Sequence, residues 1–558
     1  MISHEKPLIV QSDSSLLLDV HCSLFEDARA HIALFAELEK SPDHIHTYRV
    51  SPLSLWNAAS VGITGEAILD ILRRYSRYPI PQNIPVSIGD VLSRYGKIRL
   101  QSADRAGRLF LEVTGRELIE EIKATRKLNA LLEEREGGFL LDPINRGTIK
   151  QELIRIGYPV HDAAPLVEGD RLILDLRVST LRGASFELRD YQVEAADAFL
   201  GLGVPGTGFG TVVLPCGAGK TIVGILVMAR LKTNTLILVT NVAAVHQWID
   251  ELVDKTGVSR DEIGEYTGDR KEIRPITVAT YNILVWRKRQ DEEFPHFQIF
   301  KKRNWGLIVY DEVHLLPAPV FRVTAEIQAV RRLGLTATLV REDGRAEDVF
   351  TLVGPKRYDV PWKELEAKGW IAEARCIEIR VDLPRELKID YAVADQRGKF
   401  RLASENPLKI CIVEQLVKHH RDESILVIGQ YLKQLREISS LLGVPLITGQ
   451  TDNMQRERLY RDFREGRLKL LVVSKVANFS IDLPESSVAI QVSGTFGSRQ
   501  EEAQRLGRIL RPKKRNATFY SLVSHATSEE MFAANRQKFL TEQGYRYILE
   551  LWDEAELS

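Results

Sequence analysis

Leu-Pro-Cys-Gly-Ala-Gly-Lys-Thr at residues 214–221 directly follows the apolar run Thr211-Val212-Val213. A buried strand followed by a glycine-containing loop is typical of a phosphate-binding loop, because the glycines let successive backbone N–H groups point at the phosphates. Lys220 is expected to contact the β- and γ-phosphates, and Thr221 to offer its hydroxyl to Mg²⁺. Residues 222–230 are predicted to form a helix whose N-terminal dipole faces the same anions.

This loop departs from the generic pattern at its first position, where glycine is usual and this chain has Leu214. The specificity therefore rests mainly on residues 219–221, and a chance turn is the alternative interpretation of the loop alone. The flanking strand and helix favour binding of a nucleoside triphosphate. The loop residues expected to contact it are Pro215, Cys216, Gly217, Ala218, Gly219, Lys220 and Thr221.

A second apolar run, residues 305–310, ends in Asp311-Glu312-Val313-His314. Asp311 is expected to hold the Mg²⁺ shell and Glu312 to orient or deprotonate the attacking water, because phosphoryl transfer depends on positioning and charge neutralisation. Two carboxylates after an apolar run are also common where a strand simply meets solvent. The loop at 214–221 favours the catalytic interpretation, so the sequence predicts an NTPase with Lys220, Asp311 and Glu312 as catalytic residues.

Strand-like and helical segments alternate along two thirds of the chain. Such alternation predicts parallel sheets covered by helices, hence an α/β fold with two lobes in tandem. The strands expected in the first lobe are 211–214, 235–240, 276–279, 307–310 and 333–336. Those expected in the second lobe are 424–428, 468–473, 488–492 and 517–522. Because only the first lobe carries a phosphate loop, the second is expected to complete the site across a cleft.

Length and patterning indicate four domains along the 558 residues. Residues 1–125 are expected to form a helical accessory domain and 126–180 a small mixed α/β domain. The first motor lobe is expected at 181–365 and the second at 366–558. No repeat or low-complexity tract is visible, and no chemistry is apparent in residues 1–180.

Composition places the chain among ordinary globular proteins, with 44% hydrophobic and 27% charged residues. Lys+Arg and Asp+Glu both total 76, so net charge neither favours nor disfavours nucleic acid. Basic clusters at 287–289, 301–303 and 513–515 are candidates for phosphate contacts, although solvated surface is the common explanation for each. The four cysteines form no Cys-x-x-Cys pair, which argues against zinc ribbons and iron–sulfur clusters. Without a signal peptide or an 18-residue apolar stretch, a cytoplasmic location is expected, nucleoid-associated if the source is prokaryotic.

Residues 504–511 carry arginines spaced three apart on one helical face. Guanidinium groups delivered from another lobe would stabilise charge on a γ-phosphate and couple lobe closure to hydrolysis. A salt-bridged surface helix is the alternative, which the upstream loop and carboxylates disfavour. The catalytic candidates here are Gln504, Arg508 and Arg511.

Two shorter segments are candidates for nucleotide sensing and nucleotide binding. Thr336 and Thr338 lie in a hydroxyl-rich turn after a strand, which suits a linker that responds to the nucleotide, although a plain strand end has the same pattern. Arg189 and Gln192 precede a helix, and the Gln192 amide is able to pair with both edges of an adenine. A simple helix N-terminus is the alternative for that segment.

The ordered set of motifs resembles the superfamily 2 helicases, and within them the XPB family, over residues 186–525. The matching stretches are Leu-Arg-Asp-Tyr-Gln at 188–192, the loop at 214–221, Asp-Glu-Val-His at 311–314 and Leu-Thr-Ala-Thr-Leu-Val-Arg-Glu-Asp at 335–343. Leu214 is ordinary for that family. Residues 474–484 resemble its motif that couples DNA contact to hydrolysis, with Ala477-Asn478 where many members carry Gly-Asp.

What the resemblance implies is two RecA-like lobes that hydrolyse ATP with Mg²⁺ and move along DNA with 3′-to-5′ polarity, in DNA repair. It implies strand opening by Arg341, Glu342 and Asp343, and nucleotide contact by Asp482. It further implies a damage-recognition domain near 130–180 and a short thumb-like insertion at 386–404. From the residues alone, RNA stays an alternative to DNA.

Two other functions stay open at this stage. One is a translocase that moves along duplex DNA without separating its strands, and the other is a nucleotide-gated scaffold that loads a nuclease or another repair protein. Candidate contacts to the nucleic-acid backbone are the segments 240–241, 280–281 and 448–450, each of which also reads as a turn. A signalling GTPase is disfavoured because no Asn-Lys-x-Asp motif is present.

Overall fold

The fold was analysed in a computed structural model of the chain. It describes residues 6–40, 44–103, 107–181, 183–201, 206–215, 217–289, 294–328, 330–337, 346–360, 362–370, 372–474, 486–494, 517–542, 545 and 547–552. These residues form two compact units, of which the first comprises 1–37, 44–214 and 219–360 and the second the remainder. No helix of the described ranges is both long enough and apolar enough to cross a membrane.

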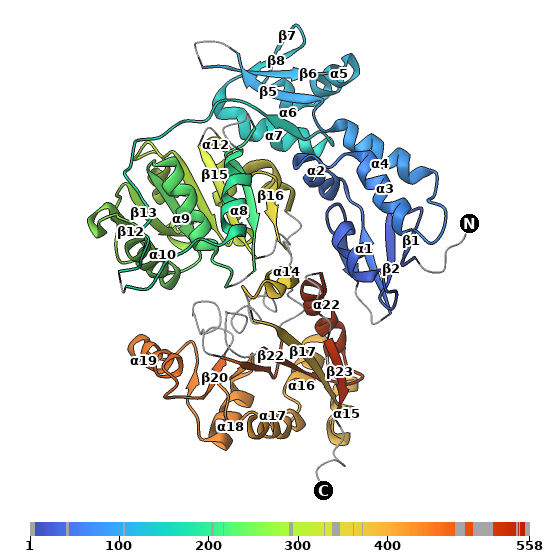
Figure 1. The fold of residues 1–558 in the computed structure, drawn as a ribbon, viewed down its shortest axis with the longest axis vertical. Coiled ribbons are helices and arrows are strands. Elements are labelled where there is room, and N and C mark those ends of the chain that lie inside the picture. Colours follow the sequence, from blue (N-terminus) through green and yellow to red (C-terminus); the bar gives the residue numbers. More distant parts are fainter. Residues whose placement is uncertain are drawn as a thin grey trace. The chain divides into compact units, whose positions relative to one another are not determined.

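The chain begins with a four-stranded sheet in the order β1-β2-β4-β3, in which β2 pairs antiparallel with β1 and with β4, and three helices follow it in the sequence (Figure 1). Its elements are β1 (Leu8–Val10), β2 (Ser15–Asp19), α1 (Phe25–Ile32), β3 (Glu37–Lys40), β4 (Ile45–Arg49), α2 (Pro52–Ser60), α3 (Gly65–Tyr75) and α4 (Asn83–Arg94). Ser51 and Thr64 cap α2 and α3 by accepting bonds from backbone N–H groups. The segment expected to be helical therefore also contains a sheet.

A second, five-stranded sheet in the order β7-β8-β6-β5-β9 covers residues 98–162. Its elements are β5 (Ile98–Ser102), β6 (Leu109–Val113), α5 (Arg116–Ala124), α6 (Arg126–Asn129), β7 (Glu133–Arg135), β8 (Gly138–Leu141), η1 (Pro143–Asn145), α7 (Arg146–Arg155) and β9 (Val160–Asp162). The pairing of β6 with β8 joins residues on either side of the boundary predicted at 125/126. That boundary was predicted from local patterning, which carries no record of which strands pair.

The first motor lobe is a seven-stranded parallel sheet in the order β12-β13-β11-β14-β15-β10-β16. Its strands are β10 (Phe209–Val213), β11 (Thr235–Val239), β12 (Ile263–Tyr266), β13 (Ile276–Thr280), β14 (Leu307–Asp311), β15 (Arg331–Thr336) and β16 (Lys356–Asp359). Its helices are α8 (Asp190–Leu200), α9 (Lys220–Leu231), α10 (Val242–Lys255), η3 (Arg260–Glu262), α11 (Tyr281–Leu284), η4 (Pro295–Phe300), η5 (Val313–Leu315), α12 (Ala318–Glu326), α13 (Ala346–Asp348) and η6 (Val349–Val353). Strands β10, β11 and β13 are buried along their whole length, as expected for a sheet covered on both faces.

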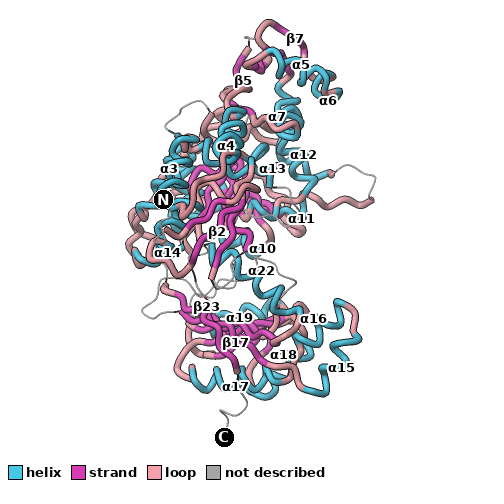
Figure 2. The backbone as a smooth tube through the Cα atoms, turned by 90° about the vertical axis from the view of Figure 1, so that its right-hand side faces the viewer, coloured by secondary structure: helices cyan, strands magenta, loops and turns pink. Residues whose placement is uncertain are grey.

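The second unit contains a second seven-stranded parallel sheet, in the order β19-β20-β18-β21-β22-β17-β23. Its strands are β17 (Ala374–Val381), β18 (Ile425–Gly429), β19 (Leu446–Ile447), β20 (Leu470–Ser474), β21 (Val488–Gln491), β22 (Ala517–Ser524) and β23 (Tyr547–Leu551). Its helices are α14 (Trp362–Ala367), α15 (Arg385–Val393), α16 (Gln396–Ser404), α17 (Leu408–His419), α18 (Leu432–Leu442), α19 (Asn453–Arg464) and α22 (Ser528–Glu542). Figure 2 shows α17 and α18 along one side of these strands.

The α/β fold with two tandem parallel lobes is confirmed, and each of the nine strands expected in the lobes overlaps an observed strand. Strands β12, β16, β17, β19 and β23 were not expected. Most of these lie at sheet edges, where short or polar runs such as Lys356–Asp359 give a weak periodic signal. The proposed thumb-like insertion at 386–404 coincides with helices α15 and α16.

Candidate active site

The glycine loop connects the carboxyl end of β10 to the first residue of α9, as the sequence predicts. Gly219 caps the helix in the left-handed conformation with φ of 80°, and Gly217 has the same φ. A Cβ atom on Gly219 would lie 2.6 Å from Nε2 of Gln192, and the positive φ would in any case strain a residue with a side chain at this position. The first N–H groups of α9 are thereby left facing the loop, which is the geometry that binds phosphate.

Lys220 lies at the start of α9 with a largely buried side chain, 11% exposed. Its Nζ is 3.5 Å from the Leu214 carbonyl oxygen and 3.8 Å from Oε1 of Glu312. These contacts place the ammonium between the start of the glycine loop and the carboxylate that follows β14. Thr221 follows on the first turn of the same helix.

Asp311 ends β14, and two aromatic side chains hold it in place. The indole Nε1 of Trp248 donates to Asp311 Oδ2 at 2.8 Å, and the hydroxyl of Tyr281 donates to the Asp311 carbonyl at 2.9 Å. Burial, together with the adjacent Glu312 carboxylate, raises the pKa of Asp311 to about 6. A cation at this carboxylate would relieve that cost, so the residues fit a Mg²⁺ ion.

Glu312 has φ of 49° and ψ of 53°, a conformation that residues other than glycine seldom adopt. Its backbone N–H donates to Asp311 Oδ1 at 3.0 Å. Oε2 of Glu312 is buried and accepts no hydrogen bond from a described residue, while Nδ1 of the His314 imidazole lies 3.5 Å away. A strained backbone that presents an unsatisfied carboxylate oxygen is typical of a residue that acts on a water or ligand.

His314 connects this carboxylate to the neighbouring strand. Its Nδ1 is 2.7 Å from Oγ1 of Thr336, the last residue of β15, and the Thr336 carbonyl accepts a bond from Leu214 N at 3.0 Å. Thr336 is therefore buried between the two strands that end in the glycine loop and the carboxylates. The role of Thr336 as a sensor stays a prediction.

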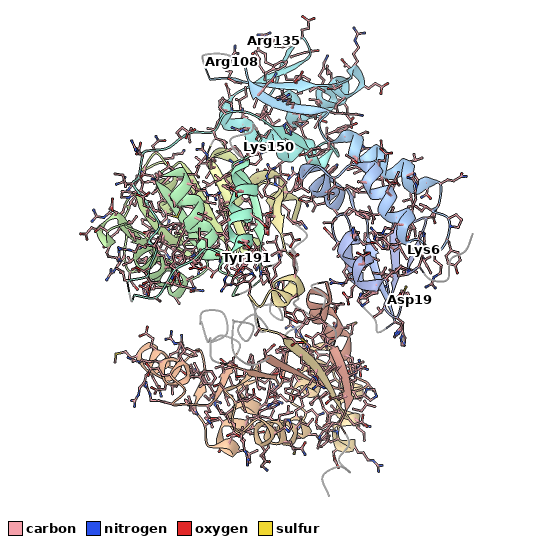
Figure 3. The ribbon with its side chains drawn as sticks, in the orientation of Figure 1. Lys6, Asp19, Arg108, Arg135, Lys150 and Tyr191 are labelled. Carbon is pink, nitrogen blue, oxygen red and sulfur yellow. The ribbon has the colours of Figure 1, made fainter. Side chains whose placement is uncertain are left out.

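The segment before α8 lies beside the glycine loop, since Gln192 is the residue that approaches Gly219. Gln192 is buried, and its Oε1 accepts from the Arg189 backbone N–H at 3.0 Å. The Arg189 guanidinium donates to the hydroxyl of Tyr191, which is labelled in Figure 3, at 2.9 Å. Gln192 thus has a capping role in the ligand-free protein, and its pairing with adenine stays a prediction.

Several predicted site residues lie outside the described residues. They are Cys216, Thr338, Arg341, Glu342, Asp343, Asp482, Gln504, Arg508 and Arg511. Their roles stay predictions. Of the loop residues that are described, Ala218 closes a turn by donating its N–H to the Pro215 carbonyl at 3.2 Å.

The segments proposed to contact nucleic acid include helix caps and a turn. Asn241 Oδ1 accepts from Ala244 N at 2.9 Å at the start of α10, and Thr280 Oγ1 accepts from Ile283 N at 3.3 Å at the start of α11. Thr448 Oγ1 accepts from Gln450 N at 3.2 Å within the segment 448–450. These bonds favour the structural interpretation that the sequence left open, although they leave the segments at the ends of strands.

Trp248, Tyr281 and His314 support the carboxylates but were given no such role from the sequence. A signal for Trp248 existed in principle at Gly224, where a Cβ atom would come within 2.6 Å of the indole. An isolated glycine inside a predicted helix indicates a close neighbour, but the sequence does not say which residue that neighbour is.

Three family descriptions match the chain. "ERCC3/RAD25/XPB C-terminal helicase" matches residues 365–553, "Helicase conserved C-terminal domain" residues 8–136, and "Type III restriction enzyme, res subunit" residues 185–341. The chain is 51% identical over 547 residues to "DNA 3'-5' helicase XPB" of Mycobacterium tuberculosis, covering 97% of both chains.

A eukaryotic relative is more distant but also aligns over nearly the whole chain. It is "General transcription and DNA repair factor IIH helicase/translocase subunit XPB/SSL2" of Saccharomyces cerevisiae, 32% identical over 614 residues, covering 97% of this chain and 72% of the relative. Among solved structures, S. cerevisiae Dbp5 bound to RNA and ADP BeF3 aligns with 66% of this chain and 91% of its own, with a TM-score of 0.46 and 15% identity.

Proposed function

We propose that this chain, which belongs to the XPB family of helicases, is an ATP-dependent DNA helicase that moves with 3′-to-5′ polarity and acts in DNA repair. The observation that carries the proposal is the group formed by Lys220, Asp311 and Glu312 at the carboxyl edge of one parallel sheet. Nucleotides bind at this edge in open α/β sheets. The family resemblance supplies the DNA substrate and the polarity.

The residues present fit ATP and Mg²⁺. The backbone N–H groups at the start of α9 and the Lys220 ammonium would hold the phosphates, and Thr221 and Asp311 would hold the metal ion. When bound, Mg²⁺ neutralises charge on the phosphates and on the carboxylate pair. Arg189 and Gln192 would hold the base, because Gln192 already lies against the loop.

Glu312 would orient the attacking water and accept its proton at Oε2, the oxygen without a hydrogen-bond partner among the described residues. His314 keeps this carboxylate in place and transmits its position to Thr336. Thr336 leads into the segment with Thr338 and with Arg341, Glu342 and Asp343, which is proposed to open the strands. Hydrolysis at Glu312 and strand opening would therefore be connected through one hydrogen bond between side chains.

The second lobe would supply the arginine side chains that take part in the reaction. Arg508 and Arg511 would stabilise charge that develops on the γ-phosphate, Gln504 would position them, and Asp482 would contact the nucleotide. Basic clusters such as 301–303 would contribute contacts to the DNA backbone that depend on salt rather than sequence. A nuclease or another repair protein is proposed as a partner, while scaffolding without unwinding is not favoured.

Steady-state ATP hydrolysis tests this function directly. The rate is measured with no nucleic acid, single-stranded DNA, duplex DNA, forked DNA and RNA at two salt concentrations, with Lys220→Ala as the blank. We expect stimulation by DNA that weakens as salt rises. An equal rate in all mixtures would contradict a DNA motor.

Unwinding and translocation are separated by two further assays on the same preparation. Displacement of a labelled strand from a 3′-tailed duplex reports helicase activity, and displacement of a triplex-forming strand reports movement along duplex DNA. We expect activity in the first assay, with little on a 5′-tailed substrate. Activity in the triplex assay alone would replace the helicase by a translocase.

A further inference from the structure

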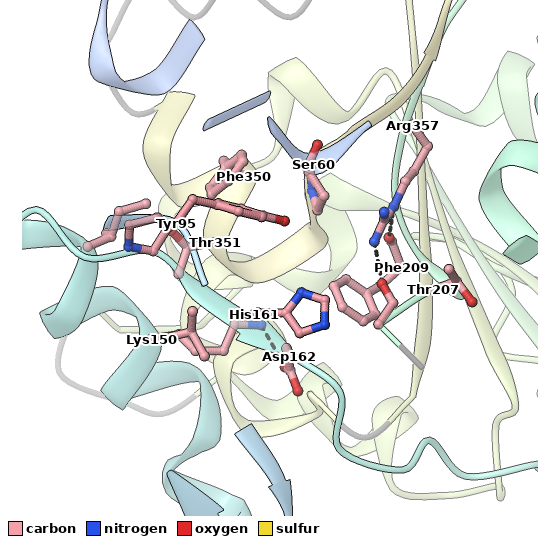
Figure 4. A pocket seen from close by; sticks show the side chains of 15 residues that line it. Ser60, Tyr95, Lys150, His161, Asp162, Thr207, Phe209, Phe350, Thr351 and Arg357 are labelled. Carbon is pink, nitrogen blue, oxygen red and sulfur yellow. Dashed lines mark hydrogen bonds and ion pairs between the residues drawn. The ribbon is translucent and has the colours of Figure 1, made fainter. Parts of the chain in front are cut away.

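A cavity separate from the nucleotide site lies within the first compact unit, where three segments of it meet (Figure 4). Its volume is about 230 Å³. The N-terminal segment contributes Ser60 and Tyr95, the five-stranded domain contributes residues 150–162, and the first lobe contributes residues 206–209 and 350–357. None of the glycine-loop residues that the structure describes lines it.

Three polar side chains, Tyr95, His161 and Arg357, point into this space in Figure 4. Neither the Tyr95 hydroxyl nor the His161 imidazole makes a hydrogen bond to a described residue. Arg357 is anchored, because its Nε donates to the Phe209 carbonyl at 3.1 Å and its Nη2 donates to the Gly206 carbonyl. Hydrogen-bond donors therefore face the cavity, and not all of their N–H and O–H groups are bonded to described residues.

The walls of the cavity carry an excess of positive charge. Asp162 is the acidic residue of the lining, and it already accepts bonds from Lys150 at 3.0 Å and from Arg146 at 2.7 Å and 3.0 Å. The Phe209 ring has three cations around it, with Lys150, Arg332 and Arg357 at 5.4, 5.2 and 5.5 Å from its centroid. Asp162 is thus bonded to two cations, Arg146 and Lys150, while Arg332 and Arg357 lie at the Phe209 ring without a hydrogen bond to this carboxylate.

Burying these cations costs free energy, and their contacts within the protein do not fully offset this desolvation. Burial lowers the pKa of Lys150 to about 8 and that of Arg332 to about 10, and it also lowers the pKa of Arg357. Nη2 of Arg332 is buried without a hydrogen-bond partner in the described part of the chain. An anion near these groups would reduce the cost.

The same region joins the five-stranded domain to the first lobe. Lys150 of α7 donates to Oε1 of Gln328 at 2.9 Å, and a Cβ on Gly147 would lie 2.4 Å from the carbonyl oxygen of Ala325. Helix α7 therefore approaches α12 at backbone distance. A ligand in the adjoining cavity would touch both the domain and the lobe.

We propose that this cavity binds a small tetrahedral oxyanion, inorganic phosphate or sulfate, and that the bound anion fastens the N-terminal segment, the five-stranded domain and the first lobe together. Tyr95, His161 and Arg357 would donate to its oxygens. The volume is below the 300 Å³ or so at which pockets for drug-sized ligands begin, which suits an ion with a few waters. Because the site exists only when the three parts are assembled, binding would stabilise that assembly.

Isothermal titration with sodium sulfate tests the site, using full-length Lys220→Ala protein so that the glycine loop does not contribute. Sodium chloride at equal ionic strength is the reference. We expect one saturable site, weakened roughly tenfold by His161→Gln, which takes the ring N–H donor out of its position, and by Tyr95→Phe, which removes the hydroxyl donor. Inorganic phosphate should compete with sulfate in the same protein.

His246→Gln is the matched control, since that histidine is 58% exposed on the same lobe. Circular dichroism and Tm without sulfate show whether each variant is folded. If His161→Gln does not fold, Tyr95→Phe alone tests the site. Heats no larger than those of the chloride reference would overturn the proposal. Sulfate binding unchanged in both cavity variants would equally overturn it, because the anion would then bind elsewhere.

Discussion

Each motor lobe holds a Lys–Glu pair near the carboxyl ends of its parallel strands. The two pairs differ in burial, in the distance between the charged groups and in the hydrogen bonds that the carboxylate accepts. In the first lobe Lys220 and Glu312 are 3.8 Å apart, with side chains 11% and 21% exposed. In the second lobe Lys409 and Glu529 are 2.8 Å apart and both 0% exposed. The two sheets have equivalent strand orders. In each, the strand that comes first in the sequence lies between the last strand and the last strand but one.

The second pair has its hydrogen bonds satisfied within the lobe. Lys409 donates to both carboxylate oxygens of Glu529 and to the Val492 carbonyl, and Glu529 also accepts from Ser524 N at 2.9 Å. Glu312, in contrast, keeps a buried oxygen that accepts no hydrogen bond from a described residue. The comparison teaches that residue types do not distinguish a structural ion pair from one proposed to be catalytic, whereas an unsatisfied carboxylate oxygen does.

The largest expected effect is on stability, from Glu529→Gln. It leaves Lys409 buried without its carboxylate, so the free energy of unfolding should fall by about 3–5 kcal/mol. Urea denaturation followed by tryptophan fluorescence measures the loss. Glu530→Gln, whose carboxylate is 28% exposed, is the control and should change little. Equal small losses in both variants would mean that the buried pair does not stabilise the lobe.

Glu312→Gln should have the next largest effect, and it should fall on catalysis. We expect turnover with DNA to decrease about 10²- to 10³-fold while ATP affinity and Tm stay close to those of the unmodified protein. Steady-state hydrolysis and titration with a fluorescent ATP analogue measure the two quantities. Glu272→Gln, at an exposed position of the same lobe, is the control. Near-normal turnover would remove Glu312 from the catalytic role.

Asp311→Asn should stabilise the protein when neither nucleotide nor Mg²⁺ is bound. The folded pKa of Asp311 is raised to about 6, so the native state holds its proton more tightly than the unfolded chain, and stability falls as pH rises from about 4 to 6. Removing the charge should raise Tm at pH 7 by about 2–4 °C and abolish this part of the pH dependence. A lower Tm at pH 7 would show that the carboxylate stabilises the empty site.

Trp248→Phe should have the smallest effect, of roughly tenfold or less on turnover. The indole N–H lowers the pKa of Asp311, so its loss should move the acid limb of the pH–rate profile to higher pH. The profile of hydrolysis between pH 5.5 and 8 measures this shift. Trp286→Phe, at a tryptophan 52% exposed, is the control. An unchanged acid limb would mean that the indole only fills space.

Much of the fold could be predicted because the strands of the lobes are short apolar runs between glycines and polar residues. Strand β10 and the start of α9 fall within two residues of their predicted positions. The candidate site was predictable for the same reason, since Lys220 and Asp311 each directly follow such a run or its loop. The sheet across the 125/126 boundary was not, because strand pairing between residues 109 and 141 depends on distant partners.

The sequence by itself determined the α/β class, the phosphate loop and the carboxylates, because local patterns dictate strands, helices and the loops at their ends. Only the tertiary structure decided which polar groups have their hydrogen bonds satisfied within the protein and which do not. Lys409 and Glu529 are 120 residues apart in the chain and bond to each other. Oε2 of Glu312, which lies near His314, accepts no hydrogen bond from a described residue. Burial and hydrogen-bond satisfaction depend on residues remote in the chain, and no local pattern records them.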